Sequence, residues 1–251
     1  MNRSFSAPFR DAQAAWARDG SVLLPLAGLA FFLGPFAAQL LLPNLPAIPE
    51  ARDEAAMRAW GDAIQAWAGS YGGWYLASPL LALFGSLSVF ALYLARPRVP
   101  LGGAMMRALA LFPRYLLASV LVSLPMAGLL SMVLAVPMLL VVAAGPIFYI
   151  FGRTMLTGPV IVADAPIGAV AAIARSWTLT RGHGWMLAAT YATIFMVPGL
   201  LGSVALSFAS AGGGNPVIVA IAAGLACLIA AGGALLLSLV QVALHRRLAR
   251  P

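Results

Sequence analysis

The chain has 251 residues, of which 62% are hydrophobic and 9% are charged. In soluble domains about a quarter of the residues are charged. The few charged side chains of this chain could not cover the surface of a water-soluble fold. The composition excludes a soluble globular protein and predicts an all-α integral membrane protein. The net charge of +8 could indicate nucleic-acid binding, but the arginines stand singly or in pairs between apolar runs. We therefore expect no nucleic-acid partner.

Six apolar runs are long enough to cross the hydrocarbon core of a bilayer as helices. In chain order they cover residues 22–42, 73–95, 115–133, 138–158, 185–208 and 217–244. A cleaved signal peptide is the competing interpretation of the first run, but the segment before it is long for a leader. The third and fourth runs are separated by Leu134-Ala135-Val136-Pro137, which predicts a tight hairpin. The fifth and sixth are separated by a glycine-rich turn at 210–216.

The arginines indicate the orientation of the spans. With the amino terminus inside the cell, only Arg52 and Arg58 fall outside, and the remaining arginines lie on the cytoplasmic side. This bias is typical of bacterial multi-pass proteins and predicts that both termini are cytoplasmic.

Amphipathic segments precede several spans of what we interpret as a single membrane domain, 1–251. Residues 1–20 are predicted to form an amino-terminal interfacial helix, and 100–112 and 166–182 to form cytoplasmic surface helices. The external loop, 43–70, is predicted to carry a surface helix in which Glu54 and Arg58 are spaced for an ion pair. A helix lying on the outer leaflet or capping the bundle is favoured over a substrate lid.

Residues 100–160 and 166–245 resemble each other. Each begins with Pro-x-Gly, and Pro125 with Gly128-Leu129-Leu130 is echoed by Pro198 with Gly199-Leu200-Leu201. We hypothesise a parallel repeat of a surface helix plus a transmembrane hairpin, present three times with a diverged first copy.

Arg153 is the charge of greatest interest, because an arginine at membrane depth is costly and marks a functional site by default. The favoured alternative is an anchor that extends to the inner headgroups. Arg153 could pair with Asp164 only if Gly158-Pro159 breaks the helix. In the segment that follows, Trp177 is expected at the interface, Arg175 and Arg181 at lipid phosphates, and Gly182 at the helix end. Ser176, which precedes Trp177, is a further candidate for this interface.

Catalytic and metal chemistry have little support in the sequence. His183 and His245 are isolated, Cys227 is the single cysteine, and no phosphate-binding loop follows a strand. We expect no catalytic residues, no metal and no cofactor, and the chain is predicted not to be an enzyme.

Three stretches resemble a known family. They are Arg153-Thr-Met-Leu, then Pro159 to Asp164, then Ala172-Ile-Ala-Arg-Ser-Trp-Thr-Leu-Thr-Arg-Gly182. Together they resemble the YciC-like bacterial inner-membrane proteins and the membrane domain of some glycerophosphoryl diester phosphodiesterases. The resemblance implies a six-span protein of the bacterial inner membrane with an arginine within a span, an acid at the end of that span and a cytoplasmic Ser-Trp segment. The acid is usually glutamate in the family, whereas here it is Asp164, displaced by about one position. No counterpart of the catalytic phosphodiesterase domain is present, so its activity is not implied.

The predicted function is a membrane-organising or partner- or lipid-binding role. A transporter of a small or lipidic substrate is the alternative. The expected partners are membrane lipids and either another protein or a second copy of the chain. A polar cavity reaching Arg153 or Gln39 would favour transport, and a solid apolar bundle would favour lipid or partner binding.

Overall fold

The computed structural model describes residues 6–51, 53–97, 99–135, 139–211 and 215–249, and these contain helices and no strand. In chain order the elements are α1 (Ala7–Ala27), the π-helical stretch η1 (Gly28–Leu33), α2 (Gly34–Leu41), α3 (Glu54–Leu94), α4 (Leu101–Ala135), α5 (Leu139–Thr154), α6 (Thr157–Ala163), α7 (Ala169–Leu179), α8 (Gly184–Ala211) and α9 (Pro216–Leu248).

Among the described residues, six helical stretches are long and apolar enough to cross a membrane, which confirms the predicted all-α membrane fold. They are Ala7–Leu41, Glu54–Leu94, Leu101–Gly128, Val142–Ala163, Gly184–Ala209 and Pro216–Leu248. Of the two predicted turns, Val136 and Pro137 in the first and 212–214 in the second lie outside the described residues.

Three predicted surface segments are continuous with a span. Residues 7–20 run into the first span within α1, residues 54–70 form the start of α3, and 101–112 forms the start of α4. No residue at these junctions adopts a positive φ, and Pro113 is accommodated inside α4. Only the segment 166–182 yields a separate helix, α7, because Gly182 adopts a φ of 80° before α8 begins. That backbone conformation is accessible to glycine at little cost.

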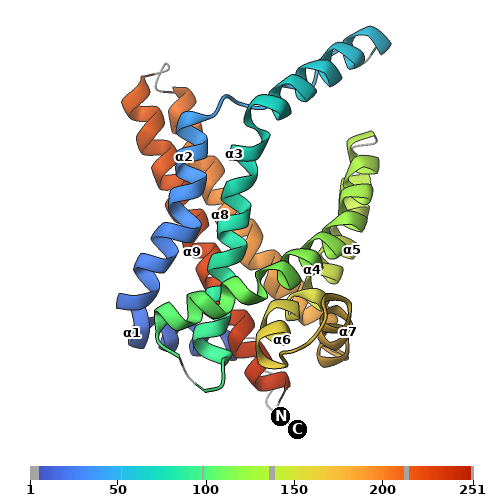
Figure 1. Ribbon diagram of the computed structural model, residues 1–251. Helices are drawn as coiled ribbons and strands as arrows, with labels where there is room; N and C mark the ends of the chain where they lie inside the picture. Colours follow the sequence, from blue (N-terminus) through green and yellow to red (C-terminus); the bar gives the residue numbers. More distant parts are fainter. Residues whose placement is uncertain (1–5, 52, 98, 136–138, 212–214, 250–251) are drawn as a thin grey trace.

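The segment 43–70 has the predicted amphipathic contacts. The Nη2 atom of Arg58 lies 2.5 Å from Oε1 of Glu54, which confirms the ion pair. The indoles of Trp60 and Trp67 donate hydrogen bonds to the carbonyls of Pro46 and Pro43, respectively. The proline-rich segment after α2 is thereby tied along the first turns of α3, which project from the bundle in Figure 1.

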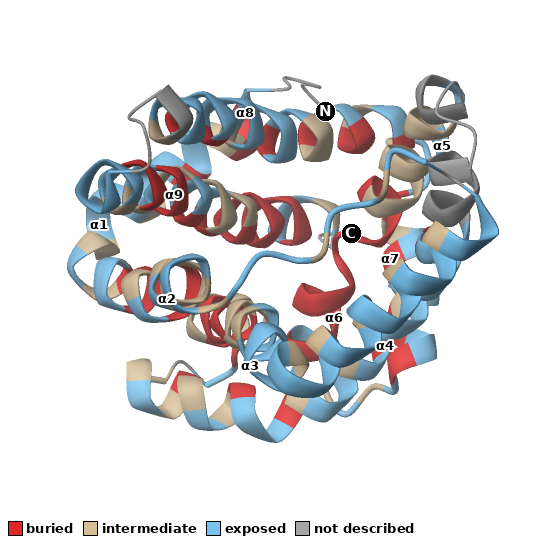
Figure 2. Ribbon diagram, turned by 90° about the horizontal axis from the view of Figure 1, so that it is seen from above, coloured by how far each residue is buried: buried red, intermediate tan, exposed pale blue. Residues whose placement is uncertain are grey.

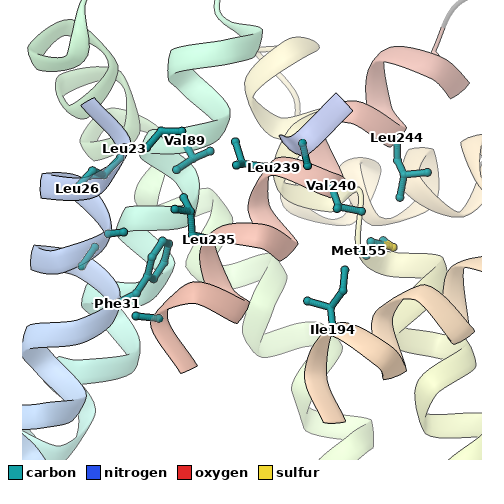
Figure 3. Packing of buried hydrophobic residues seen from close by; sticks show 14 of the residues in the cluster. Leu23, Leu26, Phe31, Val89, Met155, Ile194, Leu235, Leu239, Val240 and Leu244 are labelled. Atoms are coloured by element: carbon teal, nitrogen blue, oxygen red, sulfur yellow. The ribbon is translucent and has the colours of Figure 1, made fainter. Parts of the chain in front are cut away.

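A buried apolar cluster joins the first and last spans. It includes Leu23 and Phe31 from the first span, Val89 from α3, and Leu235 and Leu239 from α9 (Figure 3). The short helix α6 is also buried and lies among α3, α4, α7 and α9 (Figure 2). The middle of the bundle around α9 is therefore filled by apolar side chains.

The start of α1 and the end of α9 lie at the same end of the bundle as α6 and α7 (Figure 1). Arg247 near the end of α9 pairs with Asp11 near the start of α1, with Nη2 and Oδ2 2.7 Å apart. We call this the terminal end, and the end carrying the start of α3 the opposite end.

The proposed repeat stays a prediction. The two later units share an order of amphipathic segment, span and returning span. They differ in that α4 joins the first two of these in one helix, whereas the chain breaks between α7 and α8.

Candidate functional site

Arg153 lies in the last turn of α5 and is buried, with 6% of the residue exposed. The fourth span breaks just after it, at Met155 and Leu156, before α6 begins. The break therefore precedes Gly158-Pro159. The guanidinium is enclosed by the protein.

The partner of Arg153 is the carboxyl-terminal end of α7. Its Nη2 donates to the carbonyl of Trp177 at 2.6 Å and its Nη1 to that of Thr180 at 3.4 Å. The guanidinium carbon lies 4.5 Å from the centroid of the Trp177 ring, and 5.9 Å from that of Tyr149. A cation at a helix carboxyl terminus neutralises the partial negative charge of its unpaired carbonyls.

Two hydroxyl groups at the end of α7 form hydrogen bonds with the backbone of Arg153. Ser176 Oγ donates to the carbonyl oxygen of Arg153 at 2.9 Å, and Thr180 Oγ1 lies 3.3 Å from the same oxygen. Ser176 and Thr180 are both fully buried. Arg153, Ser176, Trp177 and Thr180 thus form a lock between α5 and α7, which we call the α5–α7 lock.

The other candidate residues of this segment lie outside the lock. Asp164 makes no ion pair with Arg153; it pairs loosely with Arg175, whose Nε lies 3.6 Å from Oδ2. Arg181 is exposed, and Gly182 makes the turn into α8. Trp177 is 41% exposed, consistent with its expected place at the interface.

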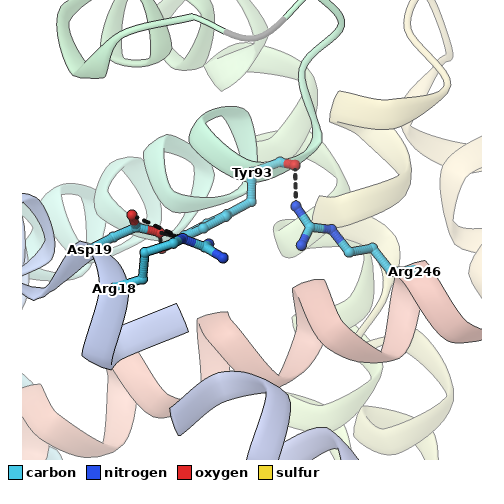
Figure 4. A network of polar contacts seen from close by, with 4 residues as sticks. All are labelled: Arg18, Asp19, Tyr93 and Arg246. Carbon is cyan, nitrogen blue, oxygen red and sulfur yellow. Dashed lines mark hydrogen bonds and ion pairs between the residues drawn. The ribbon is translucent and has the colours of Figure 1, made fainter. Parts of the chain in front are cut away.

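A second polar group lies at the terminal end and was not predicted as a site. Tyr93, near the end of α3, donates its hydroxyl to Oδ2 of Asp19 at 2.7 Å, and Arg18 Nη2 donates to the same oxygen at 2.8 Å. On the other side of Tyr93, Arg246 Nη2 donates to the Tyr93 carbonyl at 2.7 Å and its guanidinium lies over the Tyr93 ring (Figure 4).

Three cavities of about 410, 330 and 520 Å³ adjoin at this group, since Tyr93 and Arg246 line all of them. We call the three together the terminal basin. Its charged or titratable lining residues are Asp11, Arg18, Asp19, Arg96, Asp164, His245, Arg246 and Arg247.

The basin combines residues that are far apart in the sequence. Tyr93 is separated from Asp19 by 74 positions and from Arg246 by 153. The only signal in the sequence was the excess of arginine at this end of the spans, which was interpreted as topology alone. His245, interpreted as an isolated residue in the cytoplasm, is 6% exposed and lines the largest of the three cavities.

Most hydroxyl groups described within the spans donate to a carbonyl one turn earlier in their own helix. Other polar groups bridge helices, as expected for membrane proteins. Cys227 Sγ lies 3.4 Å from Oε1 of Gln39, and Ser238 Oγ lies 3.3 Å from Oγ of Ser86. Gln39 also lines a cavity of about 610 Å³ at the opposite end, whose other residues are mainly apolar.

Within the described part of the chain, no group of three or more His, Cys, Asp or Glu side chains is placed to hold a metal ion. The expectation that the chain is not an enzyme remains a prediction.

No family model, no curated protein and no solved structure matches this chain.

Proposed function

We propose that this chain is a bacterial inner-membrane protein of the YciC-like family, with both termini cytoplasmic, which organises the membrane by binding phospholipid headgroups in the terminal basin. The observation that carries the proposal is the set of arginine-lined cavities around Tyr93 and Arg246. Guanidinium groups bind phosphate through paired hydrogen bonds. A cavity at the end of a span is accessible to a lipid that diffuses in the same leaflet.

The position of α7 supports the proposal. The α5–α7 lock holds this helix beside the bundle. Trp177 in α7 and Trp185 in the first turn of α8 both pack against Tyr149 and are 41% and 70% exposed. Exposed tryptophans favour the headgroup region of a bilayer. The basin and α7 lie at the same end of the molecule (Figure 1), so the basin would lie at headgroup depth.

The orientation can be tested with single cysteines in a Cys227→Ala background, since Cys227 is buried. We expect Ala47→Cys, in the segment after α2, to react with a membrane-impermeant maleimide in intact cells. Ala249→Cys, at the end of α9, should react only after the cells are permeabilised. Labelling of Ala249→Cys in intact cells would reverse the proposed orientation.

Lipid binding can be measured by native mass spectrometry of the full chain released from nanodiscs of mixed bacterial phospholipids. We expect one or more phospholipids to be retained, and Arg246→Gln combined with Arg247→Gln to weaken retention about tenfold. Each arginine near anionic lipid contributes about 1 kcal/mol, and two of them correspond to a factor of ten or more.

The matched control is Arg58→Gln, which removes an exposed arginine at the opposite end. It should leave retention unchanged. Equal loss in the control, or full retention by the double variant, would count against a lipid site in the basin.

A transporter of a lipidic substrate is the second candidate, and the cavity beside Gln39 favours it because it gives the opposite end a binding volume of its own. The two ends are separated by the apolar cluster of Figure 3, so transport requires that cluster to open. A transporter should move a fluorescent phospholipid between the leaflets of proteoliposomes faster than protein-free liposomes do. No acceleration would leave the binding role as the better candidate.

A further inference from the structure

The largest cavity of the terminal basin lies between the ends of three helices. Its lining includes Leu94 and Ala95 at the end of α3, Ala163 and Asp164 at the end of α6, and Ala249 at the end of α9. We call it the α3–α6–α9 cavity. Each helix end contributes carbonyl groups with partial negative charge, so part of this cavity suits a cation.

The charged side chains of the cavity are of both signs. Arg96 and Arg246 supply guanidinium groups, and Asp164 supplies a carboxylate. The ion pair with Arg175 leaves the Asp164 carboxylate able to bind a ligand. The side chain of Asp164 is 40% exposed, and the Arg175 Nε lies 3.6 Å away, beyond an ordinary charged hydrogen bond. The cavity therefore offers a binding group for an anion and another for a cation.

His245 adds a buried polar side chain to the lining of this cavity. It lines this cavity, more than nine-tenths of it is buried, and its Nε2 has no hydrogen-bond partner among the described residues. A buried ring nitrogen without a partner is costly, and such groups are usually satisfied in proteins. This nitrogen has almost no accessible surface, so His245 supplies part of the cavity wall and makes no direct contact with a ligand in this conformation.

We propose that the α3–α6–α9 cavity binds a phosphate ester that carries a primary amine, as in the headgroup of phosphatidylethanolamine. Arg96 and Arg246 hold the phosphate, Asp164 and the adjacent helix-end carbonyls hold the ammonium, and His245 forms part of the cavity wall. This inference rests on the proposed lipid-binding function and specifies the class of headgroup.

The volume of about 520 Å³ lies in the range of small-molecule sites. An anionic glycerol headgroup would satisfy the arginines but would leave the carboxylate of Asp164 without a cation from the ligand. A trimethylated amine would supply charge but no N–H donor for Asp164. The site should therefore favour the primary amine over both.

The test compares lipids with identical acyl chains that bear ethanolamine, glycerol or choline headgroups. Each is added at a low fraction to nanodiscs that hold the full chain in a background of the other two, and the lipids retained are counted by native mass spectrometry. We expect phosphatidylethanolamine to be enriched about tenfold over both competitors, the effect of one charge-assisted hydrogen bond.

Two variants separate the two halves of the site. Asp164→Asn should abolish the preference for the amine while phosphatidylglycerol is still retained. Arg96→Gln should weaken retention of all three lipids about equally. Glu54→Gln, at the opposite end, is the control for the removal of an acid and should behave as the wild type. A preference that survives Asp164→Asn would overturn the assignment of the ammonium site.

The outcomes also separate this inference from the function on which it rests. Retention of phospholipid with no preference among headgroups overturns the inference and leaves lipid binding intact. Retention of none of them overturns both. Competition by millimolar glycerophosphoethanolamine would identify a soluble phosphoamine as a ligand of the same site, whereas its failure to compete with retained lipid identifies the membrane as the source.

Discussion

Gly152→Ala is expected to destabilise the protein by about 3 kcal/mol, although the same change in an open helical position is stabilising. A Cβ atom on Gly152 would lie 2.5 Å from the backbone nitrogen of Ala188, and 2.8 Å from two further backbone atoms of α8. Backbone atoms cannot yield as a flexible side chain does, so α5 and α8 must separate. Overpacking of this kind costs roughly 1–3 kcal/mol or more.

The measurement is thermal unfolding of the purified protein in a mild detergent, with Gly199→Ala as the matched control. Gly199 lies in α8, and a Cβ there meets nothing within 4 Å. Since alanine favours a helix over glycine by roughly 0.5–1 kcal/mol, the control should be as stable as the wild type or slightly more so. Equal unfolding temperatures for the two variants would show that α5 and α8 do not pack as closely as described.

Arg153→Met is expected to release α7 from the bundle while the six spans stay in place. The change removes the two charge-assisted hydrogen bonds to the end of α7 and the stacking on Trp177. Part of this loss is offset because methionine carries no charge to be desolvated. We expect a net loss of about 2 kcal/mol, which corresponds to roughly thirtyfold more frequent opening of α7.

Hydrogen–deuterium exchange of the peptides that cover α7 measures this opening. Arg175→Met is the control, since it removes an exposed arginine of α7 whose pair with Asp164 is loose. Such pairs contribute at most about 1 kcal/mol, so exchange should change little. The α5–α7 lock is disproved if both variants exchange alike. Arg153→Lys should lie between wild type and methionine, because an ammonium keeps the charge but has no planar fork.

The number of spans could be predicted from the sequence because each depends on a local run of apolar residues long enough for a bilayer. The sequence did not allow us to predict that the surface segments and the spans form single continuous helices. A change from an amphipathic to an apolar pattern marks where a helix enters the membrane, not where it ends. A helix ends where the backbone leaves the helical conformation, as at Gly182 with its φ of 80°. The backbone stays helical through 20–22 and 112–115.

The candidate site was only partly predictable for a similar reason. Arg153, Ser176 and Trp177 were singled out, and the structure brings them together. Their mutual contacts follow from the break at Met155 and Leu156, two apolar residues that carry no breaking signal in the sequence. The Asp19–Tyr93–Arg246 group depends on three different spans meeting at one end, and no local pattern encodes that meeting.

The α5–α7 lock also has a consequence for the order of events during synthesis. The Thr180 carbonyl that receives the Arg153 guanidinium is 27 residues further along the chain, so at about 5–20 residues per second it is made roughly one to five seconds later. Burying an arginine before its hydrogen-bond acceptors are present is costly. The fourth span therefore enters the bilayer without the partner of its charge, and it reaches its final depth only when α7 has emerged and docked.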